Sequence, residues 1–311
     1  MDSLFKELSF PKLAKLLKAE LGDPRVLDGF RRDPARKTHI RARGPKLITH
    51  IFAGNVPNPS ILSFVFGMLL KSANAGKLSS RDDGFLGIYL ESLRDFDKAL
   101  AASQHLIDPK NRPALLTSIQ KSDLVVAYGT NQSLKKIREE VPSGVNFVGY
   151  GHRVSFAFFS KEVLRRNKVR ALARLVAHDI WMMDRRGCLS PEMVYAEKGG
   201  EISPRDFYEY LMKELEKIDF SPERLYQLKN WLKVGQIHGD FFENLKKTGN
   251  SLQCVAVEAL SPRRESIAEQ LSALGANRIC RAGQMQAPPI TWHHDGKMNL
   301  ASWVTWTDLE E

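Results

Sequence analysis

The feature that most constrains this chain is an alternation of short apolar segments with longer amphipathic ones, which runs from residue 46 to residue 151. The apolar segments have the length and composition of buried strands. They are "KLITHIFAG" (46–54), "NAGKLS" (74–79), "SDLVVAYG" (122–129) and "GVNFVGYG" (144–151). The intervening segments have the periodicity of helices. Strands joined by helical crossovers predict a parallel sheet with helices on both faces.

A similar alternation follows in the second half of the chain. A long helix is expected at 161–185, and strands are expected at 192–197 and 251–260. Residues 221–247 have a helical pattern with an interruption, and the Arg- and Lys-rich segment 31–46 is expected to be a loop. The whole pattern indicates an α/β fold.

The restart of the alternation near residue 153 predicts a domain boundary there. We expect a first domain over residues 1–152, a second over 153–284, and a C-terminal segment, 285–311, that packs back or oligomerises. Ligands of open parallel sheets bind beyond the carboxyl ends of the strands. The loops that follow the strands of the first domain are therefore candidate binding segments.

The formal net charge of +10 leaves two kinds of anionic partner to consider. A nucleic-acid binder needs a clustered basic face and a recognisable motif, whereas here the basic residues are spread along the chain without one. An anionic small molecule such as a nucleotide is the other interpretation, and most of the charge is expected to be solvated surface. No nucleic-acid partner is expected.

Three further features indicate a cytoplasmic protein without a membrane span. No run of 18 uncharged apolar residues occurs, and the N-terminal "MDSLFKELSF" lacks the apolar region of a signal peptide. Three widely spaced cysteines fit reduced thiols better than a disulfide framework.

One of these three cysteines is a candidate nucleophile. Cys254 lies in the apolar "LQCVAVEAL" and reads as a core residue, and Cys280 has no motif around it. Cys188 lies in the predicted loop "DRRGCLSP", close in sequence to two arginines. Positive neighbours stabilise a thiolate, so Cys188 is the thiol most suited to chemistry.

A nucleophilic thiol needs a base and a site that stabilises an oxyanion. His152, in "GYGHRVSF", lies at the predicted domain junction and is the candidate base. Asn55, in "AGNVPNPS", follows a strand, and its carboxamide is the candidate oxyanion donor. An ordinary turn asparagine is the alternative for Asn55.

Two segments could contact phosphate groups. Lys77 and Ser79 follow a strand in "AGKLSSRD". Gly129 and Thr130 precede a helix in "AYGTNQS", where the first helical N–H groups are available to an anion. The chain has neither a GxGxxG fingerprint nor a P-loop pattern, so each segment alone is a weak signal. No metal site is expected.

Taken in order, these segments resemble the bacterial long-chain acyl-CoA reductases of the luminescence fatty-acid reductase type, within the aldehyde dehydrogenase superfamily. The resemblance extends from about residue 45 to the end of the chain, and "GNVP" and "GCLSP" are its most specific parts. It implies an aldehyde dehydrogenase-like fold: a nicotinamide cofactor-binding domain with a shortened N-terminus and a second α/β domain that carries the catalytic thiol.

The resemblance also implies an acyl-CoA reductase that reduces an acyl-cysteine to a fatty aldehyde with NADPH. Cys188 would be the acylated nucleophile, Asn55 the oxyanion donor and His152 the base. The resemblance assigns cofactor binding to Lys77, Ser79, Gly129 and Thr130. It further suggests acyl-CoA as the substrate and an acyl-transferring or acyl-activating protein as a partner, and it leaves a homo-oligomer open.

One departure from the wider superfamily affects the expected chemistry. Hydrolytic aldehyde dehydrogenases carry the motif E-L-G-G at the stretch that resembles Gly149-Tyr150-Gly151-His152 of this chain. Without that carboxylate, water should attack an acyl-enzyme slowly, which favours exchange with a thiol such as coenzyme A. An NAD-dependent aldehyde dehydrogenase and a non-catalytic relative that binds acyl-CoA or a partner are the alternative functions.

Overall fold

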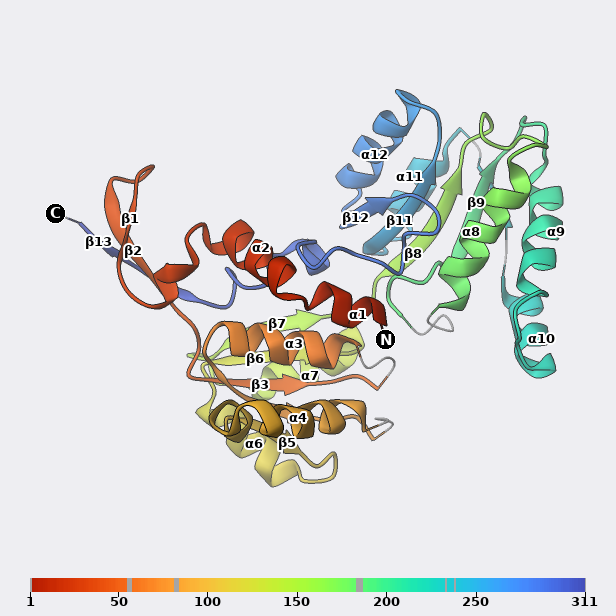
Figure 1. Cartoon of the computed structure of the whole chain (residues 1–311). Coiled ribbons are helices and arrows are strands. Elements are labelled where there is room, and N and C mark those ends of the chain that lie inside the picture. The colour runs from red at the N-terminus through yellow and green to blue at the C-terminus, as the bar shows by residue number, and fades with distance from the viewer. Residues whose placement is uncertain are drawn as a thin grey trace. The chain divides into compact units, whose positions relative to one another are not determined.

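The computed structural model describes residues 2–54, 58–80, 84–182, 187–232, 234–237 and 239–310, which divide into two compact units. Unit 1 comprises Met1–His152 and Pro289–Glu311, and unit 2 comprises Arg153–Pro288. Figure 1 labels their helices and strands.

Unit 1 contains a five-stranded parallel sheet with the strand order β5-β4-β3-β6-β7. Its strands are β3 (Leu47–Ile51), β4 (Ala73–Lys77), β5 (Gln104–Ile107), β6 (Leu124–Tyr128) and β7 (Asn146–Tyr150). Its helices are α1 (Asp2–Glu7), α2 (Phe10–Leu21), α3 (Asn58–Leu69), α4 (Phe85–Phe96), α5 (Lys98–Ala102), α6 (Arg112–Lys121) and α7 (Asn131–Glu140), with short 3₁₀ helices at Pro24–Leu27 and His294–Gly296. The parallel sheet expected for this part of the chain is confirmed.

Successive residues of β6 show how helices cover both faces of this sheet. Leu124 and Val126 pack in one apolar cluster with side chains of α2 and α3. Val125 and Ala127 point the other way and pack with side chains of α6 and α7. Side chains alternate between the faces of a strand, so a continuous apolar strand needs cover on both sides.

The segment expected to be a loop at residues 31–46 instead contains two strands. β1 (Arg31–Asp33) and β2 (Thr38–Arg43) form an antiparallel hairpin, and β2 also pairs with β13 (Thr305–Leu309). In β2 only the side chains of Ile40 and Ala42 are buried. This apolar alternation is short and interrupted by charges, and a partner strand from the other end of the chain stabilises it.

Unit 2 contains a second five-stranded parallel sheet, with the strand order β10-β9-β8-β11-β12. Its strands are β8 (Val154–Phe159), β9 (Met193–Glu197), β10 (Val234–Ile237), β11 (Leu252–Glu258) and β12 (Arg278–Cys280). Its helices are α8 (Val169–Trp181), α9 (Pro204–Leu215), α10 (Pro222–Trp231), α11 (Phe241–Lys247) and α12 (Arg263–Ala273). The predicted α/β class with parallel sheets is therefore confirmed.

The helix expected to begin at residue 161 begins at Val169. The backbone N–H of Lys161 donates to the carboxylate of Glu197 at 2.8 Å, and that of Arg166 donates to Glu201 at 3.2 Å. These bonds hold the segment before α8 in turns, because its amides bond to carboxylates far along the chain.

The helical pattern expected over 221–247 is divided by a strand. β10 begins at Val234 and pairs in parallel with the residues of β9 from Val194 to Glu197. A four-residue strand is too short to show a period of its own, so pairing with β9 decides its conformation.

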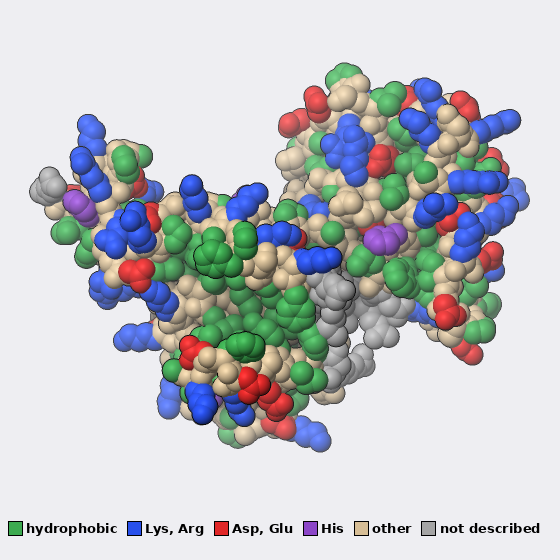
Figure 2. All heavy atoms as spheres, in the orientation of Figure 1, with side chains coloured by type: hydrophobic (Ala, Val, Ile, Leu, Met, Phe, Trp, Pro, Cys, Tyr) green, Lys and Arg blue, Asp and Glu red, His purple; other side chains and the backbone are tan. Residues whose placement is uncertain are grey.

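Among the described residues, no helix is long and apolar enough to cross a bilayer. Figure 2 shows Lys and Arg side chains spread over the visible face of each unit.

Candidate active site

Several predicted residues follow the strands of unit 1 at one edge of its sheet. Lys77 is the last residue of β4, Gly129 follows β6, and His152 lies just beyond β7. Because all five strands are parallel, these positions share the carboxyl edge, where ligands of such sheets bind. Asn55 follows β3 in sequence, and β3 lies between β4 and β6, but Asn55 itself lies outside the described residues. Ser79 follows Lys77 by two residues, and both are partly buried.

The start of α7 connects two of these positions. Thr130 caps the helix, because its Oγ1 accepts a hydrogen bond from the Ser133 N–H at 3.1 Å. The Asn131 Oδ1 accepts from the backbone N–H of His152 at 3.3 Å. The hydroxyl of Thr130 thus supports the helix terminus, while the side chain of His152 is exposed.

Cys188 lies in unit 2, in a turn beside the amino ends of the strands of that unit's sheet. The Ser190 N–H donates to the Gly187 carbonyl at 3.0 Å and closes the turn, with the Cys188 side chain exposed. The Ser155 hydroxyl donates to the Cys188 carbonyl at 2.6 Å and accepts from the Cys254 N–H at 3.2 Å. The two arginines that precede the turn in sequence lie outside the described residues.

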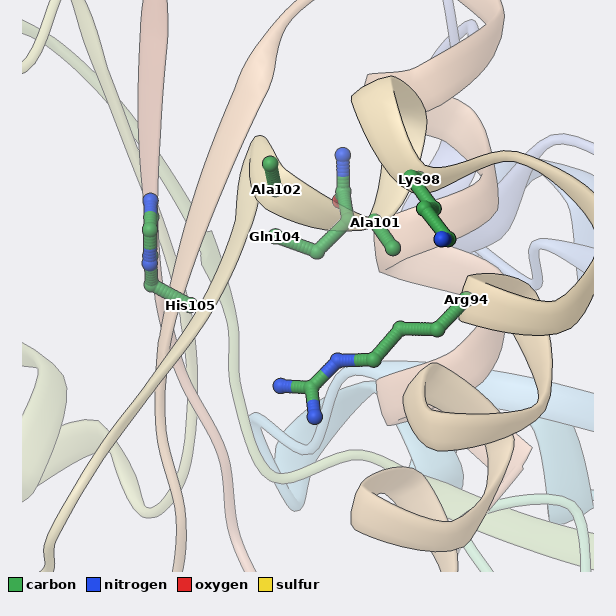
Figure 3. A pocket seen from close by; sticks show the side chains of 6 residues that line it. All are labelled: Arg94, Lys98, Ala101, Ala102, Gln104 and His105. Carbon is green, nitrogen blue, oxygen red and sulfur yellow. The ribbon is translucent and has the colours of Figure 1, made fainter.

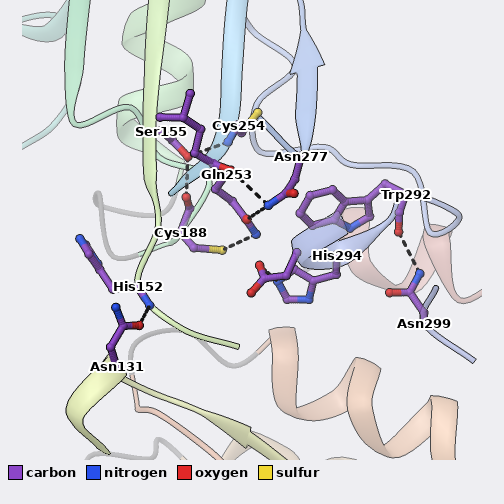
Figure 4. Close-up of polar contacts among 12 residues, drawn as sticks. Asn131, His152, Ser155, Cys188, Gln253, Cys254, Asn277, Trp292, His294 and Asn299 are labelled. Carbon is purple, nitrogen blue, oxygen red and sulfur yellow. Dashed lines mark hydrogen bonds and ion pairs between the residues drawn. The ribbon is translucent and has the colours of Figure 1, made fainter. Parts of the chain in front are cut away.

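A buried carboxamide contacts the Cys188 sulfur. The Gln253 Nε2 donates to Cys188 Sγ across 4.0 Å, and Gln253 is 1% exposed. The Asn277 Nδ2 donates to the Gln253 Oε1 at 3.0 Å and to the Leu252 carbonyl at 3.1 Å. Figure 4 shows the Gln253 side chain between Asn277 and the sulfur.

A second group of bonds holds the far side of the Cys188 turn. The Gln286 Nε2 donates to the Ser190 Oγ at 3.0 Å and to the Asp179 carbonyl at 2.9 Å. The Asp179 carboxylate accepts from the N–H groups of Gly283 and Met285 at 2.6 and 3.0 Å. Burial raises the pKa of Asp179 to about 6, and the two backbone N–H groups oppose this increase.

The cysteine expected to be a core residue is buried. Cys254 is 0% exposed, and its sulfur lies 3.7 Å from that of Cys280. The hydrogen bond with Cys280 and burial raise the pKa of Cys254, which opposes formation of a nucleophilic thiolate there. Cys188 is thus the thiol with both an exposed side chain and a buried polar neighbour at its sulfur.

Sequence reasoning missed Ser155, Gln253 and Asn277. Gln253 had a detectable signal, because it is the one polar residue among the apolar residues 252–257 of strand β11. Ser155 had a weaker signal of the same kind, because it is the polar residue of the otherwise apolar strand β8. Asn277 had none, since an asparagine just before a strand is a common turn residue.

Figure 3 shows a separate pocket of about 360 Å³ in unit 1. It is lined by Arg94, Lys98, Ala101, Ala102, Gln104 and His105. Gln104 is the first residue of β5, so the pocket lies toward the amino ends of the strands. We therefore do not assign it to the candidate site at the carboxyl edge.

A family model described as acyl-CoA reductase (LuxC) matches residues 1–235 and 223–306. The long-chain acyl-protein thioester reductase of Photorhabdus laumondii is 25% identical over 348 residues, which cover 96% of this chain and 70% of that protein. The same-named protein of Photobacterium phosphoreum is 28% identical over 189 residues, or 59% of this chain and 37% of the relative. For the Photorhabdus luminescens protein, which is 25% identical, the shares are 70% and 46%. The chain thus spans less than half the length of some relatives.

Solved structures of low sequence identity share the fold. Indole-3-acetaldehyde dehydrogenase AldA from P. syringae, solved as a mutant with NAD+, aligns with a TM-score of 0.69 at 10% identity. The alignment covers 90% of this chain and 71% of AldA. A propionaldehyde dehydrogenase from Clostridium phytofermentans aligns with a TM-score of 0.67 at 10% identity, over 87% of this chain and 77% of that one.

Proposed function

The chain belongs to the acyl-CoA reductase (LuxC) family and has the fold of the aldehyde dehydrogenases, and from this we propose that it reduces acyl thioesters to aldehydes. In this proposal Cys188 takes the acyl group from a fatty acyl-CoA, and NADPH is the reductant. The observation that carries the proposal is an exposed thiol in a turn held by buried polar side chains, with Ser155 bonded to its backbone and Gln253 to its sulfur.

Acylation begins with the Cys188 thiolate. His152 accepts the thiol proton, and the thiolate attacks the carbonyl carbon of the acyl-CoA. The carbonyl oxygen becomes an oxyanion, which accepts hydrogen bonds from the Asn55 carboxamide and the Cys188 backbone N–H. The carbon–sulfur bond to coenzyme A then breaks, and coenzyme A leaves as a thiolate that takes up a proton. The product is a thioester on Cys188.

The residues at the carboxyl edge of unit 1 fit a nicotinamide dinucleotide. Lys77 supplies a cation at the end of β4 for a ribose or phosphate group, with Ser79 beside it in sequence. Gly129 leaves space at the start of α7, where an added Cβ would meet only the Ser133 Cβ at 3.4 Å. Thr130 caps the N-terminus of α7 and keeps it in place. Bound NADPH would supply the hydride that reduces the acyl-cysteine.

In this proposal residues 1–152 bind the cofactor, and residues 153–284 carry the thiol. The stretch Gly149-Tyr150-Gly151-His152 offers no carboxylate to activate water. The acyl-cysteine should therefore hydrolyse slowly and wait for the reductant. An acyl-transferring protein is the corresponding protein partner.

Intact-mass spectrometry tests the proposal directly. The protein is incubated with acyl-CoAs of several chain lengths without NADPH, and an acyl adduct is expected on the native chain and on Cys280→Ala, but not on Cys188→Ala. NADPH should then remove the adduct and release aldehyde. Asn55→Ala should form the adduct about a hundredfold more slowly.

Aldehyde release by Cys188→Ala would refute the proposal. Oxidation of aldehyde with NAD and without coenzyme A would identify an NAD-dependent aldehyde dehydrogenase instead. Acyl-CoA binding with neither an adduct nor NADPH oxidation would identify a non-catalytic relative.

A further inference from the structure

The hydrogen bonds around Asn277 fix the orientation of Gln253. The Nδ2 of Asn277 faces two oxygens, the Leu252 carbonyl and the Gln253 Oε1. Only an amide nitrogen can satisfy both, because the side-chain oxygen of Asn277 has no proton to donate. The Gln253 oxygen is therefore the end that faces Asn277, and its NH₂ group is the end directed toward the Cys188 sulfur.

The orientation of Gln253 matters because residues 253 and 254 both connect to Cys188. Gln253 lies on β11, next to Cys254, whose backbone N–H bonds to Ser155. Ser155 in turn holds the Cys188 carbonyl. Strand β11 therefore supplies the hydrogen-bond donor that faces the Cys188 sulfur. Through Ser155, it also holds the Cys188 backbone in place. Gln253 is almost completely buried, so water competes weakly for its NH₂ group.

We propose that Gln253 is a catalytic residue whose side-chain NH₂ group stabilises the Cys188 thiolate by hydrogen bonding, and that Asn277 is the residue that positions it. The inference rests on the proposed function, in which Cys188 is the nucleophile. Hydrogen bonds to an ionised group are stronger than those to its neutral form. The contact therefore favours the thiolate over the thiol, without adding a charge to the site.

The same donor serves twice in the proposed reaction. It stabilises the thiolate that attacks the acyl-CoA. It also stabilises the thiolate released when the hemithioacetal collapses: the carbon–sulfur bond breaks, the sulfur keeps the electron pair, and the oxygen loses its proton as the aldehyde carbonyl forms.

The pH dependence of Cys188 alkylation tests this role. Iodoacetamide reacts with the thiolate, and peptide mass spectrometry separates the three cysteines. In Gln253→Met, which keeps the length of the side chain but has no donor, the midpoint pH for Cys188 should rise by about one unit. The matched control is Gln270→Met, at an exposed position of α12 whose carboxamide bonds only to the carbonyl of Ser266 in its own helix among the bonds described. This control should leave the midpoint unchanged.

A second variant tests the positioning role without altering Gln253. In Asn277→Asp, the carboxylate of residue 277 accepts hydrogen bonds and donates none. Gln253 should then turn its NH₂ group toward residue 277 and its oxygen toward the sulfur. The Cys188 midpoint should rise at least as much as in Gln253→Met, while Cys254 should stay protected from alkylation if the fold is intact.

An unchanged midpoint in both Gln253→Met and Asn277→Asp, with Cys254 still protected, would overturn the inference. Loss of Cys254 protection would identify a folding defect in that variant. The midpoint pH of the other variant then decides whether the inference stands. The assay needs neither acyl-CoA nor NADPH. A chain that shows the shift but forms no acyl adduct therefore refutes the proposed function alone, and one that forms the adduct without the shift refutes this inference alone.

Discussion

The Ser155 hydroxyl lies 2.6 Å from the Cys188 carbonyl oxygen and joins the start of β8 to the turn that carries the candidate nucleophile. Ser155 is fully buried and also accepts the Cys254 N–H. One hydroxyl thus satisfies two backbone groups, the Cys188 carbonyl and the Cys254 N–H.

Replacement of Ser155 by alanine should loosen this turn. Ser155→Ala leaves the buried Cys254 N–H without this acceptor, and we expect a loss of about 1–3 kcal/mol in the unfolding free energy of unit 2, measured in urea. Acylation of Cys188 should slow in the mass assay. Ser266→Ala, at an exposed position of α12, is the control and should change stability by less than about 0.5 kcal/mol. Equal effects of the two substitutions would argue against a special role for Ser155.

Acid should destabilise unit 1 through His50. This ring on β3 is fully buried, its Nδ1 bonds to Ser63 and its Nε2 to Asn74, and burial lowers its pKa from 6.5 to about 4. The unfolded chain binds the proton more readily than the folded one. The stability that neutral His50 gives to unit 1 is therefore complete above pH 6.5 and is lost as the pH falls toward 4. The loss should reach about 2–3 kcal/mol near pH 4.5.

Hydrogen exchange of β3 amides, corrected for the intrinsic effect of pH, measures this dependence. In His50→Gln the extra loss of protection between pH 6.5 and 4.5 should disappear, because glutamine does not titrate. An identical pH dependence in both proteins would assign the acid sensitivity to other groups.

Gly67 in α3 should resist substitution. A Cβ at this position would lie 2.0 Å from the Asn74 Oδ1, the oxygen that accepts the His50 ring proton. Gly67→Ala should therefore destabilise unit 1 by about 2 kcal/mol or more, from overpacking and loss of this buried bond. Gly87→Ala in α4 is the contrast, because its Cβ would meet only Leu106 at 3.8 Å. It should stabilise the helix by up to about 1 kcal/mol. Thermal unfolding of both variants measures these stability changes, which should have opposite signs.

The Glu20 carboxylate should hold the C-terminal segment onto α2. One oxygen accepts from the backbone N–H and the Nδ2 of Asn299, and the other accepts from the N–H groups of Leu300 and Ala301. In Glu20→Gln either orientation of the amide places its NH₂ group against two donors. Hydrogen exchange of residues 298–309 should then accelerate by at least tenfold, as loss of about 1.5–3 kcal/mol implies. Glu139→Gln, at an exposed position of α7, should leave it unchanged.

Local sequence patterns predicted some of the strands and missed others. The strands at 47–51, 124–128 and 146–150 were predictable because each is a short, mainly apolar segment between helical ones. The short β10 and the charged β2 were not, because their partners, β9 and β13, define them. The roles predicted for Lys77, His152 and Asn55 stay predictions.

The sequence by itself determined the α/β class and singled out Cys188, since apolar periodicity and a cysteine in a polar loop are properties of neighbouring residues. Only the tertiary structure decided what surrounds that sulfur. Ser155, Gln253 and Asn277 come from three separate places along the chain and meet because parallel pairing puts β8 beside β11 and β11 beside β12. Long-range pairing of strands brings such residues together, and no pattern within one short segment records it.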